Sequence, residues 1–313
     1  MTGDIIKRIL ATIPVMVIVA LFVFGLLHIT PGDPAAIIAG DYASPADVEA
    51  IREKLGLNEP IHIQFYTWLK SLADGDMGVS VFSNLPVTHL IGQRVEATLM
   101  LSILTTIFAL MAALPLGVLA AWKSRTFIDR FCMIFAVLGF SVPVFVIGYI
   151  LMYVFAIQLK WPPVQGYKEL ADGLWPCIRS LILPSLALGT LYTALIARIT
   201  RASVMEVLAE DYIRTAKAKG LNSGTILIRH ALKNAAVPIV TIIGVGIALL
   251  IGGVVVTESV FNIPGLGRLT VDAILHRDYP VIQAVIIIFS GIYVLINLLV
   301  DLSYVFFDPR IRY

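Results

Sequence analysis

The chain has 313 residues, of which 58% are hydrophobic and only 14% are charged, and its mean hydropathy is +0.90. A soluble domain carries about 25% charged residues, so this chain has too few to keep so much apolar surface in water. Its net charge of +2 is small for this length and gives no indication of nucleic-acid binding. The composition excludes an ordinary soluble protein and predicts an all-α integral membrane protein.

Six apolar blocks, almost free of charged residues, run along the chain. About 20 apolar residues in a helix cross the roughly 30 Å of hydrocarbon in a bilayer, and only a helix pairs its backbone groups within one segment. We therefore expect about six transmembrane helices. The blocks are residues 9–30, 97–122, 131–159, 180–197, 234–257 and 279–300.

Residues 1–30 are predicted to hold the N-terminus and the first transmembrane helix. The alternative is a cleaved signal peptide, but the apolar run exceeds the 7–15 residues of such a segment. Residues 31–96 are predicted to form an extracytoplasmic helical loop. Ser44, Pro45 and Asp47 have the spacing of a capped helix start, and Gly56 is expected to end that helix.

Two further helices are expected in this outer loop. Residues 60–72 place apolar side chains on one face of a helix, and Gly75 lies in the turn that closes it. Residues 86–94 are predicted to form a short interfacial helix before the second span. Composition alone leaves open whether the loop has a binding role.

Residues 97–313 are predicted to form a five-helix transmembrane core. The fourth apolar block is the shortest and is expected to lie with little tilt. Prolines and small residues interrupt the spans, and most such residues serve helix packing while a minority line a pathway or act as hinges. The candidates for a translocation path are Ser141, Pro143, Gly244 and Gly252.

The distribution of basic residues predicts that both termini lie in the cytoplasm, N-in and C-in. With this orientation, 14 of the 23 Lys and Arg residues fall on the cytoplasmic side, and the acidic residues cluster in the long outer loop. Cys132 and Cys177 then lie near opposite faces of the membrane. They are too far apart to pair, so no disulfide is expected.

The cytoplasmic loop over residues 200–233 is basic and has the pattern helix, break, helix. Residues 203–219 have helical composition, Gly220 is a natural C-cap and Ser223 can cap a second helix. A loop that only connects two spans needs a few residues, so an ordered loop of this length favours a docking surface. A basic face solvated near anionic lipid headgroups is the alternative.

Sequence motifs for catalysis are absent. The chain has no G-x-x-x-x-G-K-[ST] segment for ATP, no H-E-x-x-H and no C-x-x-C, and its five histidines are scattered. We predict no catalytic residues, no metal site and no cofactor on this chain. Glu258 and Asp301 are interpreted as groups at helix ends rather than as proton relays, which disfavours a self-sufficient, ion-coupled secondary carrier. The lack of a polar cluster at one depth also disfavours a membrane enzyme.

Four segments resemble the permease subunits of ABC importers for dipeptides, oligopeptides, glutathione and nickel. They are PGDP at residues 31–34, EDYIRTAKAKGL at 210–221 with its continuation RHALKNA to Pro238, FNIPGLGRL at 261–269 and DPRIRY at 308–313. The likeness runs from end to end and is greatest to the first, B-type, of the two paired permeases. It implies the type I importer permease fold. In the general importer motif, a Glu-Ala-Ala run precedes a Gly; here Ala216 and Gly220 match, and Arg214 and Thr215 replace Glu and Ala.

The resemblance implies an ATP-driven importer in the inner, or plasma, membrane of a prokaryote. This chain would form half of the translocation pathway for short peptides, beside a second homologous permease. Two ATPase subunits, different or identical, would bind ATP and Mg²⁺, and an extracytoplasmic substrate-binding protein would deliver the peptide. A coupling helix around residues 220–228 would fit a groove on one ATPase. The residues that the resemblance assigns to ATPase coupling are Asp211, Tyr212, Arg214, Ala216, Lys219, Gly220, Leu221 and Ser223.

Overall fold

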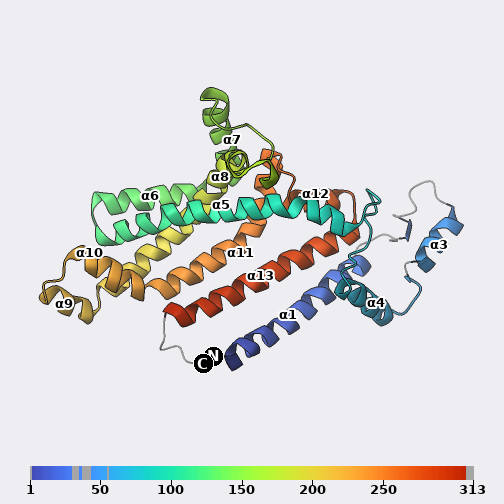
Figure 1. Ribbon diagram of the computed structural model, residues 1–313, viewed down its shortest axis with the longest axis horizontal. Helices are drawn as coiled ribbons and strands as arrows, with labels where there is room; N and C mark the ends of the chain where they lie inside the picture. The colour runs from blue at the N-terminus through green and yellow to red at the C-terminus, as the bar shows by residue number, and fades with distance from the viewer. Residues whose placement is uncertain (1, 30–34, 37–43, 55, 308–313) are drawn as a thin grey trace. The chain divides into compact units, whose positions relative to one another are not determined.

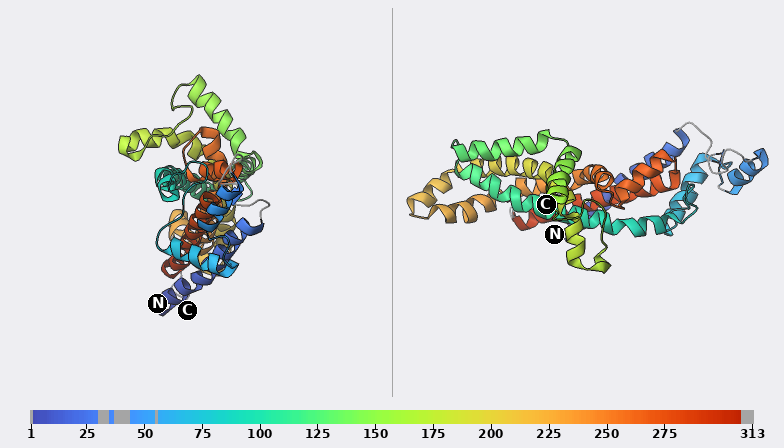
Figure 2. Two further views of the ribbon diagram at one scale, coloured as in Figure 1. Left: turned by 90° about the vertical axis from the view of Figure 1, so that its right-hand side faces the viewer. Right: turned by 90° about the horizontal axis from the view of Figure 1, so that it is seen from above.

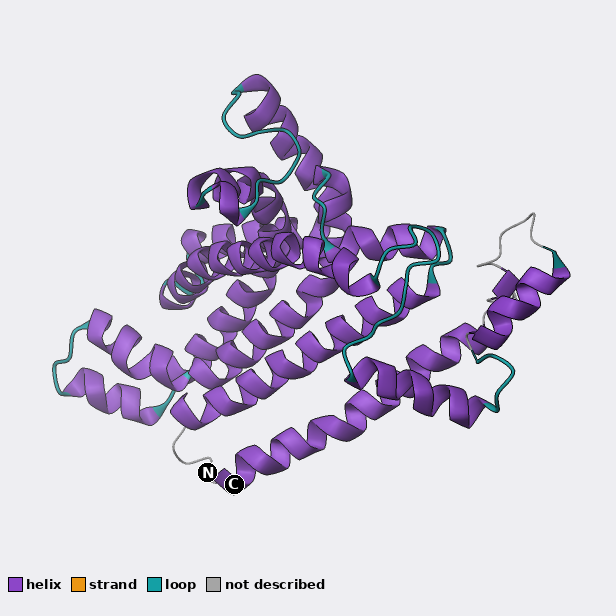
Figure 3. Cartoon of the chain, turned by 45° about the vertical axis from the view of Figure 1, so that its right-hand side comes forward, coloured by secondary structure: helices purple, strands orange, loops and turns teal. Residues whose placement is uncertain are grey.

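The computed structural model describes residues 2–29, 35–36, 44–54 and 56–307. Within these ranges the chain is built of helices and loops, without a strand (Figure 3). It divides into two compact units. Unit 1 comprises Met1–Ile5, Glu96–Arg268 and Leu295–Tyr313, and unit 2 comprises Ile6–Val95 and Leu269–Val294. The motifs at residues 31–34 and 308–313 lie outside the described residues.

The helices are labelled in Figure 1. Their bounds are α1 (Thr2–Ile29), α3 (Pro45–Lys54), α4 (Ile61–Ala73), α5 (Val87–Trp122), α6 (Phe127–Ser141), α7 (Val144–Leu151), α8 (Leu174–Leu208), α9 (Asp211–Ala218), α10 (Ser223–Thr225), α11 (Ala236–Phe261), α12 (Leu266–Leu275) and α13 (Tyr279–Phe307). Two π-helical segments, η1 (Met152–Gln158) and η3 (Ile226–Leu232), continue α7 and α10. One turn of 3-10 helix, η2 (Leu170–Asp172), precedes α8.

Among the described residues, four helices are long and apolar enough to cross a membrane: α5, α8, α11 and α13. The bent pair formed by α6 and α7–η1 makes a fifth if it is one span. In α1 the apolar helical stretch is the shorter segment Leu10–Gly25. The all-α membrane fold is confirmed, while the count of six spans and the N-in/C-in orientation stay predictions.

The third predicted span is not one continuous helix. The chain bends by 102° between α6 and α7, and Val142 is extended there, with φ −93° and ψ 127°. The proline ring of Pro143 disfavours the helical conformation for the residue before it and removes one backbone donor. Expecting a single helix over residues 131–159 was therefore wrong, and Ser141 and Pro143 lie at the bend.

Two other helices are longer than expected. Helix α5 begins at Val87 and continues to Trp122, so residues 86–94 do not form a separate interfacial helix. Helix α8 has 35 residues and extends well beyond the predicted block at both ends. The apolar block defines only the part expected in hydrocarbon, whereas helical hydrogen bonding continues into polar surroundings.

Helix α8 is the centre of unit 1. It packs against α6, α7 and α11 (Figure 1). The most apolar 18-residue stretch of α8 is 72% buried, compared with 28% for the corresponding stretch of α11. Leu181 and Leu188 are completely buried in the core that α8 shares with α5 and α11. Arg201 donates hydrogen bonds of 2.6 and 2.8 Å to the carboxylate of Asp129, which fixes α6 to α8. This two-point geometry compensates the burial of the Asp129 charge.

The helix ends predicted in the outer loop are confirmed in unit 2. Ser44 Oγ donates to Asp47 Oδ2 at 2.7 Å, and the backbone N–H of Asp47 donates back to Ser44 Oγ at 3.3 Å. The hydroxyl hydrogen bond, together with a backbone one from Ser44, lowers the pKa of the Asp47 carboxyl. Gly56 and Gly75 have positive φ and follow the ends of α3 and α4.

An aromatic cluster joins α1 to α4 within unit 2. The ring of Phe24 lies 5.3 Å from the ring of Phe65 and 5.7 Å from that of Trp68, centroid to centroid. The amide of Gln283 on α13 donates to the carbonyl of Val23 at 3.3 Å. The predicted amphipathic helix over residues 60–72 is thus present as α4, and its Phe65 is the member of the apolar face that contacts α1.

The close approach of α5 to α8 predicts the effect of a single methyl group. A Cβ atom added at Gly117 would lie 2.7 Å from the carbonyl oxygen of Ala197, whereas one added at Gly252 meets nothing within 4 Å. Gly117→Ala is therefore expected to reduce the free energy of unfolding by about 1–3 kcal/mol, because the α8 backbone has to shift. Gly252→Ala is the control and should be neutral or slightly stabilising. Thermal unfolding of the purified protein measures both, and equal melting temperatures would contradict this packing.

Candidate functional site

The loop between α8 and α11 forms a compact projection, here called the elbow (residues 209–233). It consists of α9, the turn at Gly220, α10 and η3. Figures 1 and 2 show it beyond the adjoining ends of α8 and α11. The expected helix over residues 203–219 is interrupted at Ala209 and Glu210, because α8 ends at Leu208 and Glu210 is extended as the N-cap of α9.

Gly220 ends α9 in a Schellman motif. Its N–H donates to the carbonyl of Lys217 at 3.0 Å, and the N–H of Leu221 donates to Ala216 O at 3.3 Å. Gly220 has φ +78°, a conformation that costs a residue with a Cβ atom free energy, and nothing lies within 4 Å of the position a Cβ would take. Glycine is therefore required here by the backbone conformation, and the space beside it is open.

The second half of the elbow starts at Asn222 rather than at Ser223. Asn222 is extended, and its side-chain oxygen accepts a hydrogen bond of 2.7 Å from the N–H of Thr225. Asn and Ser cap helices about equally well, so the composition alone did not distinguish them. The helix that follows changes at once to the π-helical segment η3, a form often found at functional sites.

The elbow has an inner apolar face and an outer mixed face. Ile213, Ala216 and Ile226 are buried together against Leu208, which holds α9 to η3. Leu221 is 41% exposed and Ile228 is 69% exposed. Two large apolar side chains of the elbow thus remain uncovered, although the cluster around Ile213 is already packed.

Polar contacts add rigidity to the elbow. Asn234 Nδ2 donates to the Tyr212 hydroxyl at 3.0 Å and to the carbonyl of His230 at 2.7 Å, which joins α9 to the segment that enters α11. Arg214 lies 3.3 Å from Asp211, but both side chains are largely exposed. Such a surface ion pair contributes little to stability, so these charges remain available to a partner.

The eight candidate coupling residues are thus brought together on one projection. Lys219, Gly220, Leu221 and Ser223 are exposed around the turn, and Ala216 is buried beneath it. The four candidate path residues are not gathered. Gly244 packs closely against Val300 of α13, whereas Gly252 faces open space. A part for any of these residues in transport stays a prediction.

Glu258 forms a buried clamp that sequence reasoning did not find. Its carboxylate accepts hydrogen bonds from Thr98 Oγ1 at 2.6 Å and from the backbone N–H of Arg268 at 2.9 Å. The N–H of Leu266 donates to Thr98 Oγ1 at 2.8 Å. The carboxylate therefore lies at the N-terminus of α12, where a negative charge is favourable. Glu258 is indeed a group at a helix end, and it joins α11, α5 and α12.

The clamp explains the spacing of the FNIPGLGRL segment. Asn262 adopts a left-handed conformation, φ 54°, and ends α11. A Cβ atom on Gly265 would collide with the Glu258 carboxylate, and one on Gly267 would lie 2.6 Å from the Cα of Val255. Both glycines are needed so that the chain can pass the carboxylate. The signal in the sequence was the pair of glycines seven and nine residues after a lone acidic residue.

Metal-binding clusters are not found in the described part of the chain, where no three His, Cys, Asp or Glu side chains gather. Cys132 and Cys177 are both buried and free.

Comparison with solved structures gives the class of protein first. The fold is similar to a chain of the MetNI methionine ABC transporter, solved in inward-facing conformations, with a TM-score of 0.59 over 71% of this chain and 97% of that one. The sequence identity is 17%, so the likeness concerns the fold alone. The chain therefore has the fold of a membrane subunit of an ABC transporter.

The chain belongs to the family described as binding-protein-dependent transport system inner membrane component, whose profile matches residues 113–313. The profile for the N-terminal part of the same components matches residues 1–107. Membership confirms the predicted resemblance. It favours a subunit of an ABC importer over a self-sufficient secondary carrier and over a membrane enzyme.

Three relatives that match nearly the full length of this chain are also named as permease proteins of transport systems. The chain is 56% identical to a probable peptide ABC transporter permease protein, y4tP, of Sinorhizobium fredii over 99% of each chain. It is 44% identical to the glutathione transport system permease protein GsiC of Escherichia coli over 100% of each chain. It is 40% identical to the dipeptide transport system permease protein DppB of Alkalihalophilus pseudofirmus over 98% of each chain.

The chain is therefore a multi-pass membrane subunit that takes part in transport and has no catalysis of its own. ATP hydrolysis belongs to partner subunits. In general terms its partners are another permease, ATPases and a substrate-binding protein.

The Glu258 clamp makes a prediction about stability. Glu258→Ala leaves the buried donors of Thr98 and Arg268 without their acceptor, and each unpaired donor costs about 1–3 kcal/mol. Glu258→Gln keeps the side-chain volume and one carbonyl oxygen, so it should reduce the free energy of unfolding clearly less than Glu258→Ala does. Thermal unfolding of both variants, with exposed Ser259→Ala as control, tests this expectation. If Glu258→Ala melts with the wild type, the clamp does not hold the helices.

Proposed function

We propose that this chain forms half of the translocation pathway of an ATP-driven importer for short peptides, such as dipeptides, oligopeptides or glutathione. The relatives that match almost the entire chain carry peptide, dipeptide and glutathione transport in their names. The proposed location is the inner membrane of a prokaryote. Both termini would face the cytoplasm, in agreement with the distribution of basic residues.

The observation that carries this proposal is the exposed apolar pair of the elbow. Leu221 and Ile228 are exposed on a segment that is held together by the buried cluster around Ile213 and by the Asn234–Tyr212 hydrogen bond. Exposed apolar side chains on an ordered projection are typical of a surface that a partner covers. The coupling helix, residues 220–228, is proposed to fit a groove on an ATPase subunit.

Coupling would pass from the elbow into the membrane through the two helices that adjoin it. Helix α8 enters the elbow at Leu208, and η3 leads from it into α11. When two ATPases bind ATP with Mg²⁺ and close, they would draw the elbow of this chain and that of a second, homologous permease together. Because α8 is tightly packed against α6, α7 and α11, it would move with its neighbours.

The remaining parts of the chain fit the same proposal. Residues 1–30 would supply the first span, and residues 31–96 an extracytoplasmic element that contacts the substrate-binding protein. Residues 97–313 would form the transmembrane core with the coupling loop at residues 200–233. Lipid would surround the spans, and the two ATPases could be different or identical. No nucleic acid takes part.

Gly220→Asp tests the coupling. The substitution strains the backbone and places a charge where an ATPase would dock, so we expect peptide uptake to fall by tenfold or more while the chain remains in the membrane. ATP hydrolysis would continue without responding to the binding protein. Uptake and ATPase assays on the assembled transporter in proteoliposomes measure both quantities.

Gly75→Asp is the matched control. Gly75 has φ +84°, lies in open space and ends α4 with the same pair of hydrogen bonds, from Gly75 N to Leu72 O and from Asp76 N to Ser71 O. Both variants therefore carry the same backbone penalty, but only Gly220 belongs to the elbow. Wild-type coupling in Gly220→Asp, or equal loss of ATPase association in both variants, would refute the proposal.

A further inference from the structure

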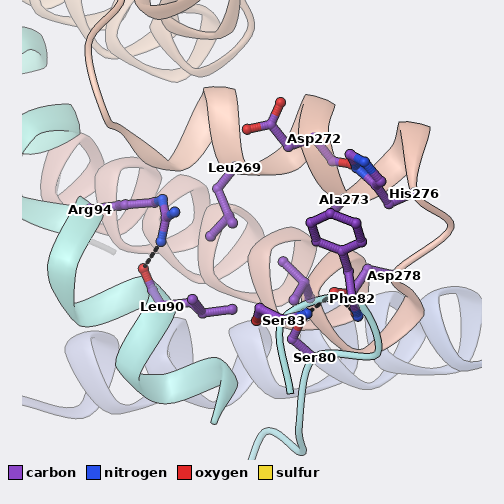
Figure 4. A pocket seen from close by; sticks show the side chains of 11 residues that line it. Ser80, Phe82, Ser83, Leu90, Arg94, Leu269, Asp272, Ala273, His276 and Asp278 are labelled. Carbon is purple, nitrogen blue, oxygen red and sulfur yellow. Dashed lines mark hydrogen bonds between the residues drawn. The ribbon is translucent and has the colours of Figure 1, made fainter. Parts of the chain in front are cut away.

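Unit 2 contains a pocket that the coupling proposal does not use. Its volume is about 340 Å³, and its walls come from the loop at residues 80–83, the first turns of α5, the helix α12 and the start of α13 (Figure 4). Small-molecule sites begin at roughly 300 Å³ and combine an apolar lining with a few polar groups. The pocket has the size and the mixed lining of such a site.

The lining of the pocket is largely apolar. Leu90, Leu269, Ala273 and Val281 line it and are all buried. At the rim the ring of Phe82 lies 4.0 Å from the imidazole of His276, centroid to centroid, and both side chains are exposed. On α12 the lining residues Asp272 and Ala273 follow Leu269 by three and four residues, so they share one face of the helix with it.

The Asp278 carboxylate shapes one wall of the pocket and is already occupied by hydrogen bonds within the chain, so it is not available to a ligand. Its carboxylate accepts hydrogen bonds from the hydroxyl of Ser80 and from the backbone N–H groups of Val81, at 3.2 Å, and Phe82, at 3.4 Å. Both Asp278 and Ser80 are buried. These bonds hold the loop at residues 80–83 against the end of α12, so the pocket is shaped before any ligand arrives.

Arg94 brings a cation to this apolar surface. Its side chain is half-buried, and Nη1 donates to the carbonyl of Leu90 at 3.0 Å (Figure 4). Within the described residues, no carboxylate pairs with the guanidinium. An arginine carries five N–H donors in a planar fork that suits a carboxylate, and one such bond leaves most of them available.

We propose that this pocket is a subsite for the C-terminal end of a short peptide, with the carboxylate on Arg94 and an apolar side chain on Leu90, Leu269 and Val281. The inference rests on the proposed function and gives it a recognition element. Asp272, which also lines the pocket, adds a negative charge that suits the ammonium group at the other end of a short peptide. The pairing of both charges with an apolar surface favours a zwitterionic peptide over a single side chain of a partner protein.

Equilibrium binding to the assembled transporter in nanodiscs, without the substrate-binding protein, tests the proposal. The probes are radiolabelled alanyl-phenylalanine and its C-terminal amide. The wild type should bind the free acid about tenfold more tightly than the amide, since a charged hydrogen-bond pair is lost in the amide. In Arg94→Gln the two probes should bind equally, and Arg94→Lys should recover part of the preference.

Lys70→Gln is the control, because Lys70 is an exposed cation on α4 in the same unit and does not line the pocket. It should keep the full preference for the acid. Equal binding of acid and amide by the wild type, or an unchanged preference in Arg94→Gln, overturns the inference. If Arg94→Gln instead weakens docking of the binding protein and leaves peptide binding intact, the pocket receives that partner and the peptide subsite is wrong. ATP hydrolysis stimulated by the binding protein, measured on the same samples, tests the proposed function separately.

Discussion

The burial of α8 is the constraint on which unit 1 depends. The most apolar 18-residue stretch of α8 is 72% buried, while those of α5 and α11 are each 28% buried and that of α13 is 6% buried. Of these four helices, α8 is therefore the one with mainly protein around it. Where lipid and protein are equally apolar, close packing rather than the hydrophobic effect holds helices together. The approach of Gly117 to Ala197 and the Arg201–Asp129 pair are the contacts that this packing requires.

Glycine is required for different reasons in the elbow and beside the Glu258 clamp. Gly220 stands in open space, and the backbone conformation at the end of α9 requires it. Gly265 and Gly267 are required by crowding, because the Glu258 carboxylate occupies the space of a side chain. The turn at Gly220 thus leaves the surface of the elbow free for a partner, whereas the Glu258 clamp holds α11 against α5 and α12. An element that transmits motion needs both an exposed contact and a rigid attachment.

Local signals in the sequence predicted the helix ends well. Gly56, Gly75 and Gly220 were each expected to end a helix, and the Ser44–Asp47 pair to start one, because each depends on residues within one turn. Pro143 was named among the residues that interrupt a span, but the 102° bend there was not predicted, because prolines within apolar spans are often tolerated, as Pro115 and Pro184 are in α5 and α8. The Glu258 clamp and the Arg94 pocket join segments more than 150 residues apart, and no local pattern encodes them.

Docking of the elbow on an ATPase can be detected by site-specific cross-linking in native membranes. The two natural cysteines are buried, so Leu221→Cys would supply an accessible thiol for a photoactivatable probe, with exposed Val79→Cys as control. Mass spectrometry of the products identifies what lies against each position. We expect a P-loop ATPase attached at Leu221→Cys and none at Val79→Cys. An intact transporter in which Leu221→Cys captures only lipid or another copy of this chain would contradict it.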